Sequence, residues 1–194
     1  FDLASLPVKY LTNSHVSESD WIVCRIPKIS IVITGEIKIN QDQRASWFSH
    51  KSEIVKPYYY SVYLADHNVT TEISPTERAA IFRFTFPQTD SSFVIVDAFD
   101  KGSYIKVIPE ENKIIGYTTR NSGGVPENFK NYFVLEFNQD FSLAQTISDT
   151  LVNEKLTINA NHVGALISFG KQDEAFEVTV KVASSFISYE QANL

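Results

Sequence analysis

Short runs of apolar and β-branched residues dominate the chain, and Pro, Gly, Asn or Asp interrupts them roughly every ten residues. This spacing is typical of strands separated by turns, and no long window keeps the i, i+3, i+4, i+7 apolar spacing of an amphipathic helix. The pattern predicts about eleven strands, at 22–33, 36–39, 58–64, 69–73, 79–86, 93–99, 104–108, 113–118, 131–138, 163–169 and 175–183.

The runs are of two kinds, which indicates how the strands pack. The run 174–182 places its Phe and Val residues on one face and mostly polar residues on the other, as in a strand with one solvent-exposed face. The run 93–96 is apolar on both faces and should lie centrally, covered from both sides. Phe82, Phe84 and Phe86 are predicted to point inward from their strand. The expected fold class is therefore all-β, a two-sheet antiparallel β-sandwich.

The clearest hairpin is predicted at 104–118, where the string Pro-Glu-Glu-Asn at 109–112 supplies turn residues between two apolar runs. The adjacent acids Glu110 and Glu111 are interpreted as an exposed hairpin tip rather than a catalytic pair. The polar string 121–124 is interpreted as a turn, with a ligand-clasping or domain-docking loop as the alternative.

Both ends of the chain look cut. The sequence contains no methionine, so Phe1 is expected to be a processed or trimmed end. A capping box begins at Ser188, which is predicted to accept a hydrogen bond from the backbone N–H of Gln191 and so to start a helix. We expect one piece of a longer polypeptide, with a β-sandwich domain at 1–187 and the start of a linker helix at 188–194.

Composition and charge narrow the classes of partner. At 194 residues and 43% apolar content, a single core can bury roughly 70% of the unfolded surface without a disulfide or metal. The net charge of −6 provides no basic field for a phosphate backbone, so nucleic acid is not an expected partner. No stretch approaches the ~18 apolar residues of a spanning helix, so no membrane insertion is expected. The single cysteine, Cys24, has apolar neighbours and is interpreted as a buried thiol.

The inventory of catalytic motifs is short. The four histidines are scattered, with no pair at a metal-ligand spacing, and nucleophile elbows, phosphate-binding glycine loops and calcium-binding loops are missing. The four histidines are His15, His50, His67 and His162. No catalytic residue and no metal site are predicted within this chain.

Asp97 is the one acid in a run that is apolar on both faces. It is expected to share a face with Phe93 and Ile95, where a partner such as Arg83 or a backbone amide must satisfy it. A glycosidase needs two carboxylates with different protonation states. The favoured interpretation is a structural buried acid, with a catalytic carboxylate as the alternative.

Exposed aromatic side chains bind sugar rings by stacking, so Trp21, Trp47 and the tyrosines at 58–60 are candidates for carbohydrate contact. In a sandwich, Tyr58 and Tyr60 on one side and Tyr59 on the other are more often packing residues. Both interpretations stay open at this point.

Certain sequence segments are more informative about function than these general patterns. They are 44–50 (RASWFSH), 57–64 (PYYYSVYL), 76–78 (TER) with 82–87 (FRFTFP), 119–124 (TRNSGG) and 182–188 (VASSFIS). In this order, they closely resemble the N-terminal β-sandwich domain of family ninety-two glycoside hydrolases, the bacterial exo-acting α-mannosidases. The resemblance runs from about residue 11 to 194, and its last string resembles the family's passage into linker helices that lead to an (α/α)6 barrel.

The resemblance implies calcium-dependent, inverting hydrolysis of terminal α-mannosides, at a site formed between sandwich and barrel. The carboxylates and calcium ligands of such enzymes lie mainly in the barrel, so calcium is expected in the absent catalytic domain and not in this chain. The implied partners are that catalytic domain and α-mannoside glycans, and the implied location is periplasmic or secreted. His15 and Trp21 resemble a family segment near the domain interface and are the expected substrate-binding residues. The family's usual opening segment is missing before Phe1.

The first hypothesis is therefore an accessory sandwich, inactive alone, that completes the cleft of an α-mannosidase. A free-standing carbohydrate-binding sandwich without catalysis is the alternative, and a cell-surface interaction module is a third. If a second domain normally covers one side, an apolar patch is expected around 184–189 and the 121–124 loop.

Overall fold

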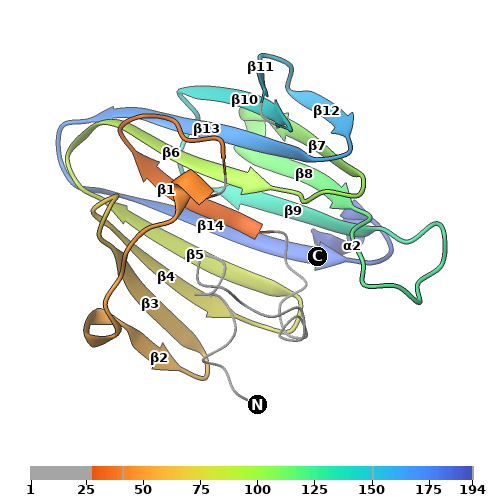
Figure 1. Cartoon of the computed structure of the whole chain (residues 1–194), viewed down its shortest axis with the longest axis horizontal. Coiled ribbons are helices and arrows are strands. Elements are labelled where there is room, and N and C mark those ends of the chain that lie inside the picture. The colour runs from red at the N-terminus through yellow and green to blue at the C-terminus, as the bar shows by residue number, and fades with distance from the viewer. Residues whose placement is uncertain (1–27, 41, 150, 194) are drawn as a thin grey trace.

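The computed structural model describes residues 28–40, 42–149 and 151–193, which form two antiparallel sheets packed face to face (Figure 1). The smaller sheet has five strands, in the spatial order β1 (Lys28–Thr34), β6 (Thr89–Asp97), β13 (Val163–Gln172), β10 (Leu143–Ser148) and β11 (Leu151–Asn153). The larger sheet has nine, in the order β12 (Thr157–Ala160), β7 (Ser103–Ile108), β8 (Lys113–Thr118), β9 (Asn131–Phe137), β14 (Phe176–Ser185), β5 (Ala79–Phe86), β4 (Val69–Pro75), β3 (Tyr59–Leu64) and β2 (Ile54–Lys56). The predicted all-β sandwich is confirmed.

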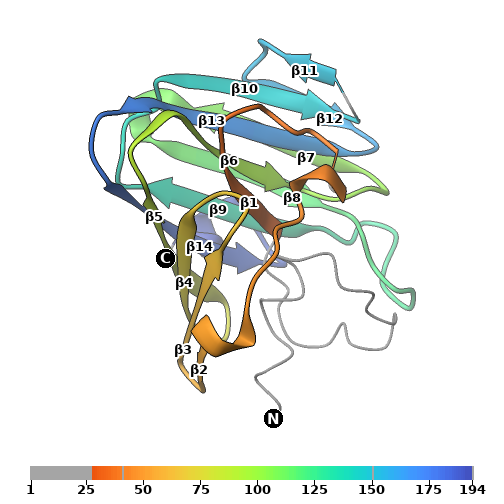
Figure 2. The same cartoon turned by 60° about the vertical axis from the view of Figure 1, so that its left-hand side comes forward.

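The larger sheet extends past the smaller one. Its last strands, β2 and β3, project beyond β1 in both views (Figures 1 and 2). The described residues also include three 3-10 turns, at Asp42–Arg44, His50–Ser52 and Pro109–Glu111, and one short helix, α2 (Tyr189–Ala192). Within the described part of the chain, no helix has the length and apolarity needed to cross a membrane.

The main core fills the space between the two sheets. Val94 and Val96 of β6 and Ile167 of β13 pack there against Phe84 and Phe86 of β5, each at most 1% exposed. The inward direction predicted for β5 and for alternate residues of β14 is confirmed, since Val178, Val180 and Val182 are also at most 1% exposed. The order of burial along the strands therefore follows the alternation in the sequence.

A second, smaller cluster lies on the opposite face of the five-stranded sheet. Phe93 and Ile95 of β6 pack with Ile147 of β10 and Leu166 of β13, and Ile39 covers them from the segment that follows β1. β6 is flanked by β1 and β13 and is buried on both faces, as the run 93–96 predicts. The segment around Ile39 thus acts as a third layer over part of the smaller sheet.

Most predicted strands are found, and two have the predicted bounds, β5 and β8. The strand predicted at 36–39 is wrong, because this segment forms a loop whose Ile39 covers the second cluster. The strands β2, β10, β11 and β12 were not predicted. They have at most six residues and no continuous apolar face. Of the first predicted strand, 22–27 lie outside the described residues.

The predicted hairpin at 104–118 is formed by β7 and β8, which pair from Ser103 with Thr118 to Ile108 with Lys113. Its tip is the 3-10 turn Pro109–Glu111, which is followed by Asn112, whose φ of 50° is left-handed. Asparagine adopts this conformation more readily than most residues because its short polar side chain bonds locally. The acids at the tip are exposed, as predicted.

The predicted helix start at the C-terminal end is also confirmed. Ser188 has an extended backbone, and its hydroxyl accepts a hydrogen bond from the backbone N–H of Gln191 at 3.3 Å. Helix α2 packs on β9 and β14. Ala192 is buried, and the Tyr189 ring meets the Tyr132 ring edge-on at 4.9 Å between centroids.

Candidate functional site

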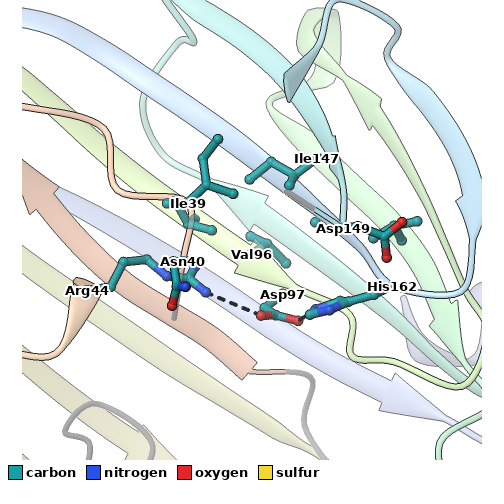
Figure 3. Close-up of a pocket in the computed structure, with 11 residues that line it drawn as sticks. Ile39, Asn40, Arg44, Val96, Asp97, Ile147, Asp149 and His162 are labelled. Carbon is teal, nitrogen blue, oxygen red and sulfur yellow. Dashed lines mark hydrogen bonds and ion pairs between the residues drawn. The ribbon is translucent and has the colours of Figure 1, made fainter. Parts of the chain in front are cut away.

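A pocket of about 180 Å³ lies where β6 ends and β13 begins (Figure 3). Its apolar wall includes Ile39, Ile95 and Ile147, which belong to or cover the second cluster. Its polar wall includes Arg44 from the turn at Asp42–Arg44, Asp97 at the end of β6 and His162 just before β13. Three segments far apart in the sequence therefore deliver the charged groups to one place.

Asp97 is at the centre of this arrangement. Its carboxylate oxygens lie 2.8 Å from Nε2 of His162 and 3.4 Å from Nη2 of Arg44, and Oδ1 accepts the backbone N–H of Phe99 at 2.9 Å. Burial alone raises the pKa of a carboxyl group, but His162, the Phe99 N–H and Arg44 outweigh it and hold the pKa of Asp97 below its usual value. The carboxylate is therefore ionised and fully engaged.

The hydrogen bond from Phe99 also controls the backbone after β6. Phe99 has a φ of 68°, a left-handed conformation that is uncommon for a bulky side chain and costs on the order of 1 kcal/mol or more. Asp97 accepts the N–H two residues along, which closes the turn locally. The guanidinium of Arg120 lies 5.2 Å from the centre of the Phe99 ring and covers it.

Arg44 is an unusually buried cation, with 3% of its surface exposed. Burial lowers its pKa, and the carboxylate of Asp97 opposes that effect. Within the described residues, the Nε atom of Arg44 has no hydrogen-bond partner. The Arg44 carbonyl lies 3.4 Å from Nε2 of His67, a 2% exposed side chain whose pKa is lowered by burial. The turn is thus tied to the core on two sides.

His162 is half-buried and forms the solvent-facing side of the cluster. The hydrogen bond to Asp97 raises the pKa of His162, and the Asp97 charge adds to this, against the opposing effect of burial. The ring therefore binds its proton more tightly than a free histidine. A protonated His162 and Arg44 then place two cations around one carboxylate.

This geometry supports a structural role for Asp97. A general acid must remain protonated at the working pH, which requires a raised pKa, whereas the pKa of Asp97 is lowered. Both carboxylate oxygens are already bonded to neighbouring groups. Among the described residues, no group of three or more His, Cys, Asp or Glu side chains could hold a metal ion.

The structure corrects the partner expected for Asp97. The expected backbone amide is present, at Phe99, but Arg83 does not pair with Asp97. Arg83 lies on β5 of the other sheet and makes two 2.6 Å hydrogen bonds to Glu72 of β4. Arg44 and His162 were not recognised from the sequence as partners, because they lie 53 and 65 residues from Asp97 and no local pattern relates them.

The fold leaves some of the aromatic candidates exposed and buries others. Trp47 is 68% exposed and Tyr58 is 66% exposed. Tyr60 is only 4% exposed and donates its hydroxyl to Glu53 at 2.6 Å. Tyr58 lies in a turn before β3, so it does not share a strand face with Tyr60 as predicted. Trp47 and Tyr58 remain the described aromatics with the largest free surface.

The two substrate-binding residues expected from the resemblance, His15 and Trp21, lie outside the described residues, as does Cys24. Glu110 and Glu111 are exposed and far along the hairpin, where Glu111 pairs with Lys113 at 3.2 Å. The 121–124 loop is a bend in which the backbone N–H of Gly123 donates to the Asn121 side chain at 2.8 Å.

Solved structures with the same fold include several mannosidases. The family GH92 inverting mannosidase BT2199 from Bacteroides thetaiotaomicron is 38% identical, with a TM-score of 0.78 over 84% of this chain and 22% of that one. The family GH92 α-mannosidase BT3965 from the same organism, solved with mannoimidazole, is 28% identical, with a TM-score of 0.74 over 84% of this chain and 24% of its own. The GH92 family glycosyl hydrolase ccman5 shares the fold at 22% identity and a TM-score of 0.69.

The chain thus spans less than a quarter of the length of these enzymes. No match was found among the curated proteins. Residues 15–185, which include both sheets, match the glycosyl hydrolase family 92 N-terminal domain. With that match over most of its length, and with 38% identity to an inverting mannosidase of known structure, the chain belongs to glycoside hydrolase family 92 as its N-terminal domain.

Proposed function

We propose that this chain is the accessory N-terminal domain of a calcium-dependent, inverting α-mannosidase. In this proposal it completes the substrate cleft of a catalytic (α/α)6 domain in the same polypeptide, which hydrolyses terminal α-mannosides in glycans. The observation that carries the proposal is the match of 84% of this chain to the inverting mannosidase BT2199, of which the chain covers 22%. Most of such an enzyme therefore lies outside the part that resembles this chain.

The state of the buried acid supports this division of labour. Asp97 is held ionised between Arg44 and His162, so it is unsuited to protonating a leaving group. In our proposal, both catalytic carboxylates and the calcium ligands come from the catalytic domain. His15 and Trp21 contribute to the wall of the substrate pocket. The protein works in the periplasm or outside the cell, where mannose-containing glycans are encountered.

The direct test uses the full-length protein that contains these residues. It should release mannose from α-linked mannobioses, lose activity on chelation and recover it with calcium, and give the inverted anomer by NMR. His15→Ala and Trp21→Ala should raise KM without changing the melting temperature, while the exposed His50→Ala serves as the matched control. The absence of hydrolysis across all α-mannobiose linkages by a folded full-length protein would overturn the proposal.

The exposure of Trp47 and Tyr58 favours one second candidate, a carbohydrate-binding sandwich that acts without catalysis. Calorimetry of the 194-residue chain with mannosides separates the two functions. Binding that Trp47→Ala abolishes and Tyr63→Ala leaves intact would support the second candidate. A lack of heat at millimolar glycan, together with hydrolysis by the full-length protein, would reject it.

A further inference from the structure

Four tyrosines gather at one end of the larger sheet, on the face turned away from the core. Tyr104, Tyr117 and Tyr132 are directly opposite one another on β7, β8 and β9. Their ring centroids are 5.5 and 6.0 Å apart along this row, and Tyr189 of α2 continues it at 4.9 Å from Tyr132. All four side chains are partly exposed. We call these residues the tyrosine row.

The ring geometry argues against a sugar-stacking platform. A sugar ring stacks on an open aromatic face. Tyr104 and Tyr117 are stacked on each other with an angle of 16° between their planes, and the ammonium of Lys130 lies 4.2 Å from the centre of the Tyr117 ring. The faces of these two rings are therefore largely engaged within the protein.

The row carries hydrogen-bonding groups instead. Asn159 of β12 donates to the Tyr117 hydroxyl at 3.3 Å, which places an amide beside the phenols. Burial, and then the neighbouring Tyr104, Tyr117 and Tyr132, raises the pKa of Tyr189, which agrees with the close packing of its ring at the end of the row. Tyrosine supplies a rigid apolar ring and a polar tip, a combination enriched at protein interfaces.

Two observations bear on which part of the protein this surface faces. Helix α2 lies on β9 and β14, with Tyr189 in the row itself, so the described chain reaches its last helix beside the tyrosine row. Immediately before α2, Phe186 is 45% exposed and Ile187 is 70% exposed, so apolar surface is present on the segment that joins β14 to α2. An apolar patch is expected at a contact between domains of one chain.

We propose that the tyrosine row is the docking surface for the catalytic domain, which in the proposed function follows the linker that begins with α2. This inference rests on the proposed function for the existence of that domain, and it adds the residues that hold the two domains together. The phenols, the Asn159 amide and the Lys130 ammonium all donate hydrogen bonds. The facing surface of the catalytic domain is accordingly rich in carboxylates and backbone carbonyls.

Hydroxyl-radical footprinting with mass spectrometry tests the docking surface. Oxidation rates of individual tyrosines are compared between the full-length protein and the 194-residue chain at the same low concentration, without glycan. Tyr104, Tyr117 and Tyr132 should be protected several-fold in the full-length protein. Tyr63, which is 40% exposed on β3 of the same sheet, is the matched control and should oxidise at equal rates in both.

Three other outcomes of the footprinting experiment would each overturn the inference. Equal oxidation rates of the row in both proteins would show that nothing covers it. Protection that appears only after an α-mannoside is added would identify a glycan surface. Protection in the 194-residue chain that grows with its concentration would identify a second copy.

A double variant provides a second measurement. Tyr117→Phe with Tyr132→Phe keeps both rings and removes two hydroxyls, so the sandwich itself should keep its fold. In calorimetry of the full-length protein, the two domains should melt together in the wild type and further apart in the double variant, whereas Tyr63→Phe leaves the melting unchanged. Unchanged melting of the double variant would argue against the docking surface. A full-length protein that docks in this way but cleaves no mannoside would refute the proposed function alone.

Discussion

His162 and Asp97 are 65 residues apart in the sequence, and their side chains meet at 2.8 Å between Nε2 and Oδ1. Asp97 ends a central strand of the smaller sheet, and His162 directly precedes the strand that pairs with it. The bond therefore joins the end of β6 to the start of β13 at one edge of that sheet, beside the pocket of Figure 3.

This pair should make stability depend on pH. The pKa of His162 is raised by folding, so its contribution is fully present below the unfolded-state pKa of about 6.5 and is lost as pH rises through the folded-state pKa. The pKa of Asp97 is lowered, so its contribution is present above the unfolded-state value of 3.8 and is lost as pH falls through the folded-state pKa. The pair stabilises the fold most between about pH 4 and 6.5.

Urea unfolding of His162→Gln measures this effect. Between about pH 6 and 8, the free energy of unfolding of the wild type should fall relative to that of the variant, because only the wild type loses a proton from the pair. His50→Gln is the control, since the side chain of His50 is 84% exposed and bonds only to neighbouring Glu53 among the described residues. Parallel pH profiles for wild type and His162→Gln would contradict the prediction.

Of two arginine–carboxylate pairs, the one with the longer N–O distance should contribute more to the free energy of unfolding, because it is buried. Arg83 makes two 2.6 Å bonds to Glu72 but its side chain is 46% exposed, whereas the Arg44 contact with Asp97 is 3.4 Å and buried. Arg83→Gln should cost less than about 1 kcal/mol because solvent screens the pair. Arg44→Gln should cost about 3 kcal/mol because it leaves a buried carboxylate with one cation fewer. Chemical denaturation of both variants measures these costs. Equal losses of unfolding free energy would show that burial does not determine how much each pair contributes to stability.

Gly116 on β8 should tolerate no side chain. A Cβ atom there would overlap the Phe133 ring and the Tyr104 carbonyl oxygen, and the latter belongs to backbone fixed by strand pairing. Gly116→Ala should therefore cost about 1–3 kcal/mol or more through overpacking. Gly123→Ala has open space but a φ of 105°, so its cost should be about 1 kcal/mol and purely conformational. A Gly116→Ala protein as stable as Gly123→Ala would mean that β8 and β9 adjust freely.

The covered outer face of the smaller sheet is tested with two leucines. Leu166 of β13 is fully buried in the second cluster, and Leu151 of β11 is 70% exposed. Leu166→Ala should cost about 2–5 kcal/mol in unfolding free energy, as for other buried leucines. Leu151→Ala should change it by no more than about 0.5 kcal/mol. If the two substitutions cost the same, the segment around Ile39 does not exclude water from that face.

The sequence predicts well where burial is periodic and turn residues are distinctive. β5 alternates over its whole length, and β8 begins directly after the turn at 109–112, so both have their predicted bounds. β10 and β12 lie at or near sheet edges, where polar residues are tolerated on both faces, and their strand signal is correspondingly weak.

The cluster around Asp97 was only half predictable. The cost of burying an ionised group predicts that Asp97 must have partners, and the backbone N–H of Phe99 is close enough in sequence to be expected. Arg44 and His162 reach it only because β13 pairs with β6 and the segment after β1 folds back over the smaller sheet. Such contacts depend on the register of long-range pairing, which a single sequence does not reveal.

The position of β14 has a consequence for synthesis. This strand lies between β9 and β5, and it joins the part of the larger sheet made of β2–β5 to the part made of β7–β9 and β12. On the ribosome, the two parts of the sheet cannot be joined until β14 has been synthesised, so closure of the sheet comes late and depends on pairing between residues distant in sequence. A product that terminates before Phe176 would present two bare strand edges, which are templates for aggregation.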